Sequence, residues 1–411
     1  MKPRVLAKKL PKESIKSLVL LTGARQTGKT TLVKKLYPNL RYVNFDAIEN
    51  REKIALIHSD EWAKTVGLAI IDEAQKWPQV FEKIKYAYDS GDLSFSVLLG
   101  SAQILLLKKV RESLAGRISI FELYPLMLCE LIADDDEQLS APLFSKLLQG
   151  HLVRDVLATE PKIIFDHELK IKNWEKHLLR VGGMPNLLSL PDEATCFMWL
   201  RDYEQTYLER DLSDLARLQD LQRFRTFQKL SALRSAQLIN YSQLARDATL
   251  SVDTAKRYLE YLRLSYQVFL LQPYHSNLTS SLVKTPKLYW TDIGIWRSLT
   301  NFQTDLSGQL FETYVVSECM KWIKSNRERV ELYFYRTKHG LEVDLIIETS
   351  QGIIGVEIKG RPIIDQRDAT ALLSIKQNVP KWLGGIIIYT GDAIKCLVED
   401  IWLIPSWRFF S

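Results

Sequence analysis

A stretch near the start of the chain carries the residues best suited to chemistry. It contains Gly23, Ala24, Arg25, Gln26, Thr27, Gly28, Lys29, Thr30 and Thr31. This spacing fits the pattern G-x4-G-K-[ST], in which two glycines let backbone N–H groups curl around phosphates. Lys29 would bind the β- and γ-phosphates of ATP, and the Thr30 hydroxyl would bind Mg2+. The stretch therefore predicts a phosphate-binding loop, with a chance glycine-rich turn as the alternative.

Two carboxylates follow an apolar run about forty residues further along the chain. The run 68–71 is Leu-Ala-Ile-Ile, and Asp72 and Glu73 come directly after it. A short apolar run of this kind is typical of a buried parallel strand, and ligands bind at the carboxyl ends of such strands. Asp72 would hold the water shell of Mg2+, and Glu73 would polarise the water that attacks the γ-phosphate. Acids also follow buried strands by chance, which is the alternative.

Two further polar residues lie at predicted element ends. Ser101 follows the apolar run 94–100 and could contact the γ-phosphate or the attacking water. Helix capping is the alternative role for Ser101. Arg117 lies between a predicted helix and a predicted strand, where ring-forming ATPases present an arginine to a neighbour's nucleotide. Arg111 competes for this role, and either arginine could instead stabilise a helix end.

The C-terminal third holds a different group of charged residues. A predicted helix carries Glu312, and two predicted strands carry Asp344 and the pair Glu357 and Lys359. Residues two apart in a strand share a face. This set matches the PD-(D/E)xK nuclease arrangement, in which Glu312, Asp344 and Glu357 would bind Mg2+ and Lys359 would stabilise developing charge. Solvated strands also carry such spacing, and a nuclease fold without cleavage is a further alternative.

The elements that must position the first two groups alternate between strand and helix. Apolar or β-branched runs predict strands at 18–21, 41–45, 68–71, 94–100 and 118–123. Strands that alternate with helices predict an α/β fold with a parallel sheet. The carboxyl edge of that sheet would gather the loop and the acids. The order of strands, loop, acids and arginine resembles that of the AAA-type ATPases.

Three regions with different sequence patterns follow this α/β core. We expect an ATPase core at 1–127, a helical lid and linker at 128–214, a winged helix at 215–280 and a PD-(D/E)xK-like α/β domain at 281–411. In the expected winged helix, Ser251 would cap a helix at 252–264 that follows a helix at 242–248. Arg246, Lys256 and Arg257 would then face outward and contact DNA phosphates. Packing of the winged helix against protein is the alternative.

Length indicates a multidomain protein, and the charge distribution suits one that binds a polyanion. A chain of 411 residues exceeds one ordinary domain, and its net charge of +6 is unevenly spread. Residues 1–40 hold ten Lys or Arg and one Glu, and residues 222–263 hold eight Lys or Arg and three acids. Such patches suit nucleic acid, although a solvated surface is the alternative.

The remaining composition predicts a cytoplasmic protein. Four cysteines lack metal-binding spacing and are typical of reduced thiols. No apolar run reaches 18 residues, and the basic start lacks a signal-peptide pattern. We therefore expect no membrane partner.

Motifs along nearly the whole chain resemble those of a prokaryotic family that joins an AAA-type ATPase to a C-terminal region of unknown function. The nucleotide motifs are Gly-Ala-Arg-Gln-Thr-Gly-Lys-Thr (23–30), Ile-Asp-Glu-Ala-Gln (71–75), Gly-Ser-Ala-Gln (100–103) and Leu-Ala-Gly-Arg (114–117). The C-terminal motifs are Tyr-Leu-Glu-Arg-Asp (207–211), Phe-Glu-Thr-Tyr-Val-Val (311–316) and Glu-Val-Asp (342–344). The resemblance implies ATP binding, rings, a winged helix and a PD-(D/E)xK-like domain.

These observations leave two functions open. The first is an ATP- and Mg2+-dependent ATPase that forms a hexamer-like homo-oligomeric ring and remodels or moves on DNA, with a nuclease-like domain. The second is a nucleotide-dependent regulatory or scaffold protein, in which an inactive nuclease fold binds protein partners. DNA binding that weakens steeply with salt would distinguish the first from the second.

Overall fold

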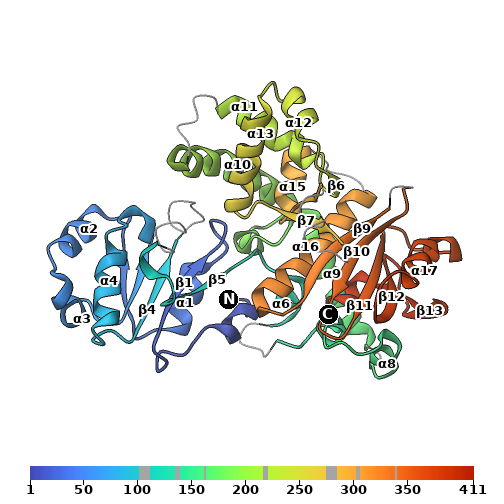
Figure 1. The fold of residues 1–411 in the computed structure, drawn as a ribbon, viewed down its shortest axis with the longest axis horizontal. Coiled ribbons are helices and arrows are strands. Elements are labelled where there is room, and N and C mark those ends of the chain that lie inside the picture. The colour runs from blue at the N-terminus through green and yellow to red at the C-terminus, as the bar shows by residue number, and fades with distance from the viewer. Residues whose placement is uncertain are drawn as a thin grey trace.

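The structure is a computed structural model in which a sheet domain at each end flanks a helical middle (Figure 1). It describes residues 1–100, 112–134, 139–161, 163–215, 221–274, 285–301, 306–337 and 340–411, except for the side chains of 207–215. Ser101 and Arg111 lie outside the described residues. No helix in the described ranges is both long and apolar enough to span a bilayer.

The N-terminal domain is built on a parallel sheet of five strands in the order β2-β3-β4-β1-β5. The strands are β1 (Ser17–Thr22), β2 (Arg41–Asn44), β3 (Ala69–Asp72), β4 (Phe95–Leu99) and β5 (Ile118–Glu122). The described helices are α1 (Lys29–Leu36), α2 (Ile48–Ala55), α3 (Trp62–Thr65) and α4 (Val80–Asp89). The predicted α/β fold with a parallel sheet is confirmed.

Side chains of β1 explain why this sheet is buried on both faces. Leu18 and Leu20 point into one apolar cluster, whereas Val19 and Leu21 point into another. Successive side chains in a strand point to opposite faces, so an unbroken apolar run fills both clusters. β4 lies between β1 and β3 and thereby sets the distance between the glycine-rich loop and the acids.

The middle of the chain is helical. Its helices are α6 (Leu128–Ile132), α7 (Leu143–Leu147), α8 (Val153–Ala158), α9 (Phe165–Val181), α10 (Glu193–Leu215), α11 (Leu221–Ala232), α12 (Tyr241–Asp247) and α13 (Val252–Leu264). The predicted cap of α13 is confirmed, because Ser251 Oγ accepts a hydrogen bond from Thr254 N at 3.1 Å. α12 and α13 pack together as a helix-turn-helix pair.

The C-terminal half is organised by a mixed sheet of nine strands, in the order β13-β14-β12-β11-β10-β9-β7-β8-β6. The strands are β6 (Gln237–Leu238), β7 (Val268–Pro273), β8 (Lys287–Trp290), β9 (Glu331–Arg336), β10 (Glu342–Glu348), β11 (Ile353–Lys359), β12 (Trp382–Tyr389), β13 (Lys395–Val398) and β14 (Ile401–Pro405). The helices are α15 (Ile293–Thr300), α16 (Gly308–Asn326), α17 (Thr370–Lys376) and α18 (Ser406–Phe409). The predicted wing strand, β7, pairs with β8 and β9, so one sheet continues across residue 280.

Two contacts join the N-terminal domain to the rest of the chain. The 3-10 helix η1 (Val5–Lys9) packs against α16, and the N-terminus lies beside this orange helix in Figure 1. Leu126 N donates to the carbonyl of Gly183, which follows α9, at 2.7 Å. A Cβ atom on Gly183 would lie 2.3 Å from the Leu126 carbonyl oxygen, so only glycine allows this approach.

Candidate functional site

The glycine-rich loop leaves the carboxyl end of β1 and enters α1 at Lys29. Gly23 and Gly28 have φ angles of 142° and 92°, which side-chain-bearing residues rarely adopt. Lys29 Nζ donates to the carbonyls of Gly23 at 3.0 Å and Ala24 at 2.7 Å, and Thr27 Oγ1 donates to the Ala24 carbonyl at 3.0 Å. These bonds hold the loop against the start of α1, so that the backbone of the loop surrounds the Lys29 ammonium.

The first acid meets the loop as the sequence predicts. Thr30 Oγ1 donates to Asp72 Oδ2 at 2.7 Å, across the strand that separates β1 from β3. Tyr42 OH, on β2, donates to the same oxygen at 2.8 Å, a contact that sequence reasoning missed. A hydroxyl beside a carboxylate is the kind of oxygen donor set that Mg2+ takes. The residues present therefore fit Mg2+ at Thr30 and Asp72.

The second acid, Glu73, lies in an unusual backbone conformation, with φ of 52°. Its amide donates to Asp72 Oδ1 at 2.9 Å, and its carboxylate accepts a hydrogen bond from Gln75. Burial raises the pKa of Glu73, and the nearby charge of Arg25 partly opposes this effect. A carboxylate whose pKa is raised is a stronger base toward an attacking water. Non-glycine residues held in this region of φ often lie at functional sites.

Arg4 supports the loop from behind, although the sequence showed it only as one of several N-terminal cations. Its side chain is 5% exposed. Nη1 donates to the Thr27 carbonyl at 2.8 Å, and Nη2 donates to the Tyr124 carbonyl. Nε lies 3.2 Å from Glu130 Oε2 in α6. A buried guanidinium thus ties the phosphate-binding loop to the helical middle of the chain.

A cavity of about 400 Å³ opens beside the loop. Thr27, Gly28 and Thr31 line one side of it. The rest of the lining comes from the N-terminus, the segment before α6, α9 and the 3-10 helix η4 (Pro185–Ser189). These residues are Met1, Lys2, Arg4, Leu126, Trp174, Pro185, Leu188 and Ser189. Its lining is mostly apolar, and Lys2 Nζ lies 5.0 Å from the centre of the Trp174 ring. Residues more than 140 positions apart meet here, which no local pattern in the sequence reveals.

Arg117 lies at the opposite edge of the sheet from the loop. It directly precedes β5, whereas the loop directly follows the parallel neighbour β1. A strand of this length spans about 16 Å at ~3.3 Å per residue, so Arg117 does not meet the loop of its own chain. Its Nε pairs with Asp89 Oδ1 at 2.6 Å at the end of α4. Ser101, the other residue predicted near the γ-phosphate, lies outside the described part of the chain.

The residue just before the loop contacts the residue just after the helix-turn-helix pair. Thr22 Oγ1 and Tyr266 OH lie 2.6 Å apart. Tyr266 OH also donates to Glu122 Oε1 at 3.1 Å, and Tyr124 OH donates to Glu122 Oε2 at 2.8 Å. Tyr266 has φ of 60° and turns the chain from α13 into β7. This cluster of four side chains joins the N-terminal sheet to the end of α13.

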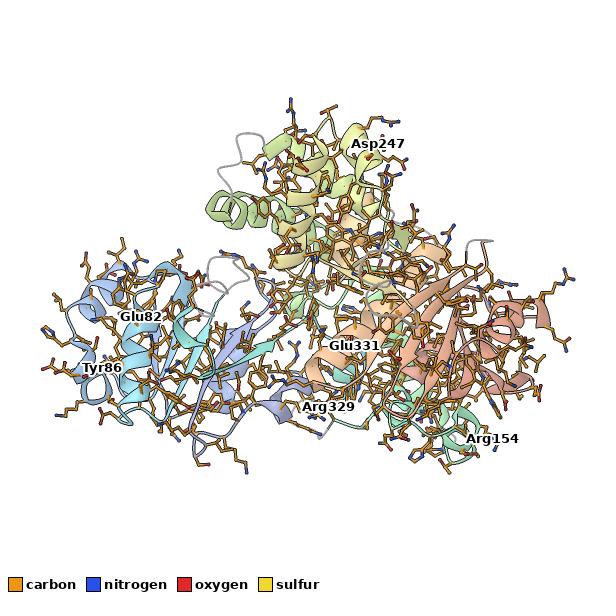
Figure 2. All side chains as sticks on the ribbon, viewed as in Figure 1. Glu82, Tyr86, Arg154, Asp247, Arg329 and Glu331 are labelled. Atoms are coloured by element: carbon orange, nitrogen blue, oxygen red, sulfur yellow. The ribbon has the colours of Figure 1, made fainter. Side chains whose placement is uncertain are left out.

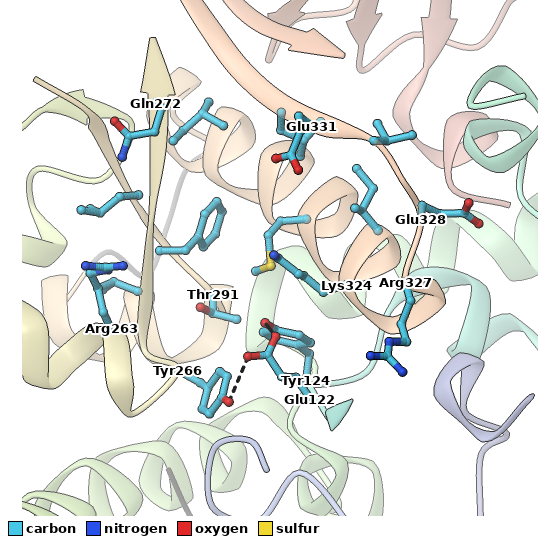
Figure 3. Close-up of a pocket in the computed structure, with 18 of the residues that line it drawn as sticks. Glu122, Tyr124, Arg263, Tyr266, Gln272, Thr291, Lys324, Arg327, Glu328 and Glu331 are labelled. Carbon is cyan, nitrogen blue, oxygen red and sulfur yellow. Dashed lines mark hydrogen bonds between the residues drawn. The ribbon is translucent and has the colours of Figure 1, made fainter. Parts of the chain in front are cut away.

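The same cluster lies at one end of a cavity of about 730 Å³, where Figure 3 shows the bond between Tyr266 and Glu122. The cavity lies between β5, the end of α13, β7 and the end of α16, and three cations line it: Arg263, Lys324 and Arg327. Four acids line it as well, namely Glu122, Glu260, Glu328 and Glu331, the last of which is also labelled near the centre of the molecule in Figure 2. The four acids outnumber the three cations, so the cavity does not have the basic lining of a nucleic-acid groove.

The three residues predicted to contact nucleic acid are exposed. Arg246 lies on α12, and Lys256 and Arg257 lie on α13. This region forms the outer tip of the molecule, where Figure 2 labels Asp247, the residue that follows Arg246 in the chain. The surface is therefore accessible from solvent, and its contacts with nucleic acid stay a prediction.

In the C-terminal sheet, β10 and β11 bring three of the four predicted nuclease residues together. Asp344 Oδ2 accepts a hydrogen bond from Ile358 N at 2.9 Å, so it lies beside Glu357 on the neighbouring strand. Lys359 Nζ lies 2.6 Å from Glu357 Oε2 and 3.9 Å from Asp344 Oδ2. Burial, followed by the charge of Asp344, raises the pKa of Glu357 to about 8.

The fourth residue, Glu312 on α16, has partners that the sequence did not reveal. Its Oε1 accepts hydrogen bonds from Tyr289 OH at 2.6 Å and Lys287 Nζ at 3.0 Å. Lys287 Nζ also lies 2.5 Å from Glu342 Oε1. Burial, followed by the charge of Asp344, raises the pKa of Glu312 to about 7. Burial alone would lower the pKa of Lys287, but the surrounding carboxylates hold it above its ordinary value.

A divalent metal ion does not fit this C-terminal group as the residues stand. Within the described ranges, no group of three or more His, Cys, Asp or Glu side chains is arranged to hold a metal ion. Two lysine ammonium groups lie among the carboxylates instead. The metal-binding role of Glu312, Asp344 and Glu357 therefore stays a prediction without geometric support.

Comparison with known families divides the chain into three segments. Residues 16–132 match an AAA domain, residues 171–306 match a domain of unknown function (DUF8612), and residues 307–409 match another (DUF4143). The chain therefore joins an AAA domain to a C-terminal domain of unknown function, as the sequence motifs predicted. The AAA domain supports ATP binding and hydrolysis in general terms.

Two mycobacterial proteins are similar to this chain along most of its length. The uncharacterized proteins Mb2031c of Mycobacterium bovis and Rv2008c of Mycobacterium tuberculosis are each 29% identical over 402 residues, covering 95% of this chain and 80% of theirs. Among solved structures, the Walker-type ATPase PABY2304 of Pyrococcus abyssi is 16% identical and has a TM-score of 0.40. That comparison covers 70% of this chain and 91% of the other.

Proposed function

We propose that this protein hydrolyses ATP at the Gly23–Thr31 loop and couples hydrolysis to work on DNA as a homo-oligomeric ring. The observation that carries the ATPase part is the contact between Thr30 and Asp72, with Glu73 held directly beside Asp72. A loop cation, a loop hydroxyl and two acids thus meet at one sheet edge. This is the constellation that ATP hydrolysis needs.

Each residue has a distinct task in this proposal. Lys29 and the loop amides bind the phosphates, and Thr30 and Asp72 would hold Mg2+, which neutralises phosphate charge when bound. Glu73 orients and deprotonates the attacking water. The cavity that contains Trp174 and Leu188 is large enough and apolar enough to receive the nucleobase.

The ATPase part is tested by ATP turnover of wild type and Lys29→Ala, each with and without DNA. We expect wild type to hydrolyse ATP and Lys29→Ala to lose at least ~100-fold in kcat, because phosphate-charge stabilisation is lost. Lys35→Ala is a matched control, since Lys35 is exposed on the same helix. Turnover that is absent, or equal in wild type and Lys29→Ala, would contradict the proposal.

The DNA part rests on exposed cations at the outer tip of the molecule. Arg246, Lys256 and Arg257 would contact phosphates from α12 and α13. Affinity should fall steeply with salt and drop further in Lys256→Ala/Arg257→Ala. Lys381→Ala, in the turn before β12, removes one charge elsewhere and should leave DNA affinity nearly unchanged. Binding that is absent or insensitive to salt would favour a regulatory or scaffold protein that binds protein partners instead.

A further inference from the structure

The C-terminal acids surround a lysine that comes from outside the predicted nuclease set. Lys287 begins β8, and its side chain is 3% exposed. Its ammonium lies 3.0 Å from Glu312 Oε1 on α16 and 2.5 Å from Glu342 Oε1 on β10. The two carboxylates come from different elements, so one cation holds a helix to a strand.

Neighbouring groups complete the surroundings of this ammonium. Tyr289 OH, two residues along β8, donates to the same oxygen of Glu312 at 2.6 Å. Asp344, two residues after Glu342 on β10, acts on Lys287 electrostatically. Arg336 Nη1 lies 3.2 Å from the other oxygen of Glu342, at the rim of the group.

The other two acids of the group, Glu357 and Asp344, also lie beside a lysine. Lys359 lies against Glu357 and near Asp344, while Asp344 also accepts the Ile358 amide. In the part of the chain that the structure describes, Glu357 Oε1 is buried without a hydrogen-bond partner. One oxygen of each carboxylate in the predicted metal set is already paired with a lysine ammonium or a backbone N–H, so these oxygens are not free for a divalent ion.

We propose that the Lys287 ammonium takes the place of a divalent metal ion between Glu312 and Glu342, so that this group is held together by a built-in cation. Removing a buried cation leaves its carboxylates unpaired, which is costly unless another cation replaces it. The group in wild type is therefore metal-free, and the C-terminal domain keeps a nuclease-like arrangement without the ions that metal-dependent cleavage uses. This inference requires neither ATP hydrolysis nor DNA binding.

The proposal is tested by measuring Mn2+ binding to full-length, nucleotide-free protein with electron paramagnetic resonance. We expect wild type and Asp344→Asn to bind Mn2+ equally weakly, because the wild-type group has no metal site. Mn2+ bound by wild type and lost in Asp344→Asn would overturn the proposal. This comparison needs no change at Lys287, so it is decisive even if variants of that residue do not fold.

The second measurement replaces the lysine itself. Lys287→Ala should bind Mn2+ at least ~10-fold more tightly than wild type. Changes in the groups that surround a metal's ligands commonly alter metal affinity by about this factor. Mn2+ should also raise the Tm of Lys287→Ala, and adding Asp344→Asn should abolish both effects. Lys376→Ala is the matched control, because Lys376 is a lysine of the same domain that pairs with Asp400, at 3.1 Å, and not with Glu312 or Glu342. A folded Lys287→Ala that gains no Mn2+ affinity would show that the ammonium does not stand in for a metal ion.

Discussion

Glu73 combines a raised pKa with a constrained backbone, and both properties suit a group that activates water. Glu73→Gln keeps the shape and the partner Gln75 but cannot accept a proton. We expect kcat to fall by about 10² to 10⁴, the usual contribution of a general base, with little change in ATP affinity. Steady-state turnover and binding of a fluorescent ATP analogue check the two expectations separately.

The outcome distinguishes catalysis from assembly of the site. If Glu73→Gln weakened ATP binding as strongly as it slowed turnover, Glu73 would be a structural residue of the loop. Glu52→Gln is a suitable control, because Glu52 lies exposed on α2 in the same domain.

Glu175 gives the fold a pH dependence of its own. It lies half-buried on α9 with its Oε1 atom buried, and burial raises its pKa from 4.5 to about 7. A folded-state pKa above the unfolded value means that the protonated form stabilises the fold below about pH 4.5, and that this stability is lost as the pH rises through about 7. Glu175→Gln cannot ionise, so its stability relative to wild type should grow by up to about 3 kcal/mol from pH 5 to pH 8.

Thermal unfolding of both proteins across this pH range measures the effect. The exposed Asp166, on the same helix, provides the control Asp166→Asn, whose Tm should stay parallel to that of wild type. If the difference between Glu175→Gln and wild type were independent of pH, the buried carboxyl would not titrate in this range.

At the scale of elements, the turn after α9 fixes the helical middle to the ATPase domain. Gly183 donates its N–H to Asp292 Oδ2 at 2.7 Å and accepts from Leu126 N at 2.7 Å. Gly183→Ala would force its Cβ to within 2.3 Å of a backbone oxygen, so we expect a loss of about 2 kcal/mol or more. A lower Tm and a smaller soluble yield would report it.

Gly308 supplies the matched control for this prediction. It begins α16, and a Cβ added there meets nothing within 4 Å. Gly308→Ala should therefore be neutral or slightly stabilising, by up to ~1 kcal/mol. Equal Tm values for the two alanine variants would mean that the α9 turn adjusts its backbone to make room.

Elements were predictable wherever local pattern decides them. The apolar run of β1, the loop after it and the Ser251 cap all depend on residues within a few positions of one another, and each lies where the sequence predicts. The roles of Arg4, Lys287 and Tyr266 depend on partners 126, 25 and 244 positions away, respectively. No periodicity records such contacts, because the fold and not the local chain brings the partners together.

For the assembled protein, we predict that Arg117 completes the active site of a second copy. Arg117 lies about 16 Å along β5 from its own loop, by the rise of a strand, and its pair with Asp89 is solvent-exposed. Exposed pairs contribute ~1 kcal/mol or less, so the arginine is easily released to a neighbour. We expect Arg117→Ala to lose ATP turnover while it keeps ATP binding.

Mixing two inactive variants tests this arrangement. Lys29→Ala keeps the arginine, and Arg117→Ala keeps the loop, so a mixed ring contains some complete sites and should recover part of the activity. Asp89→Ala should retain turnover, because the pair itself is not needed for catalysis. Mixtures that stay as inactive as the separate variants would contradict a site shared between copies.

Coupling between ATP and DNA should pass through Tyr266. Its hydroxyl contacts Thr22, the residue before the loop, and Glu122 on β5. Its backbone lies two residues after the end of α13, the helix that carries Lys256 and Arg257. We therefore expect a movement of the loop on ATP binding to reach the end of α13 through Tyr266. Linkage requires that ATP change DNA affinity by the same factor as DNA changes ATP affinity, commonly 5- to 150-fold when two sites are coupled.

Tyr266→Phe removes only the hydroxyl and keeps the ring against Tyr124, where the ring centres are 5.8 Å apart. We expect each ligand to bind the variant alone about as well as wild type, but their mutual effect to shrink at least ~5-fold. Titrations of a non-hydrolysable ATP analogue with and without DNA measure the effect, and Tyr241→Phe, on α12, is the control. Equal coupling in Tyr266→Phe and wild type would mean that loop and helix communicate by another route, for which the buried pair of Arg4 and Glu130 is the next candidate.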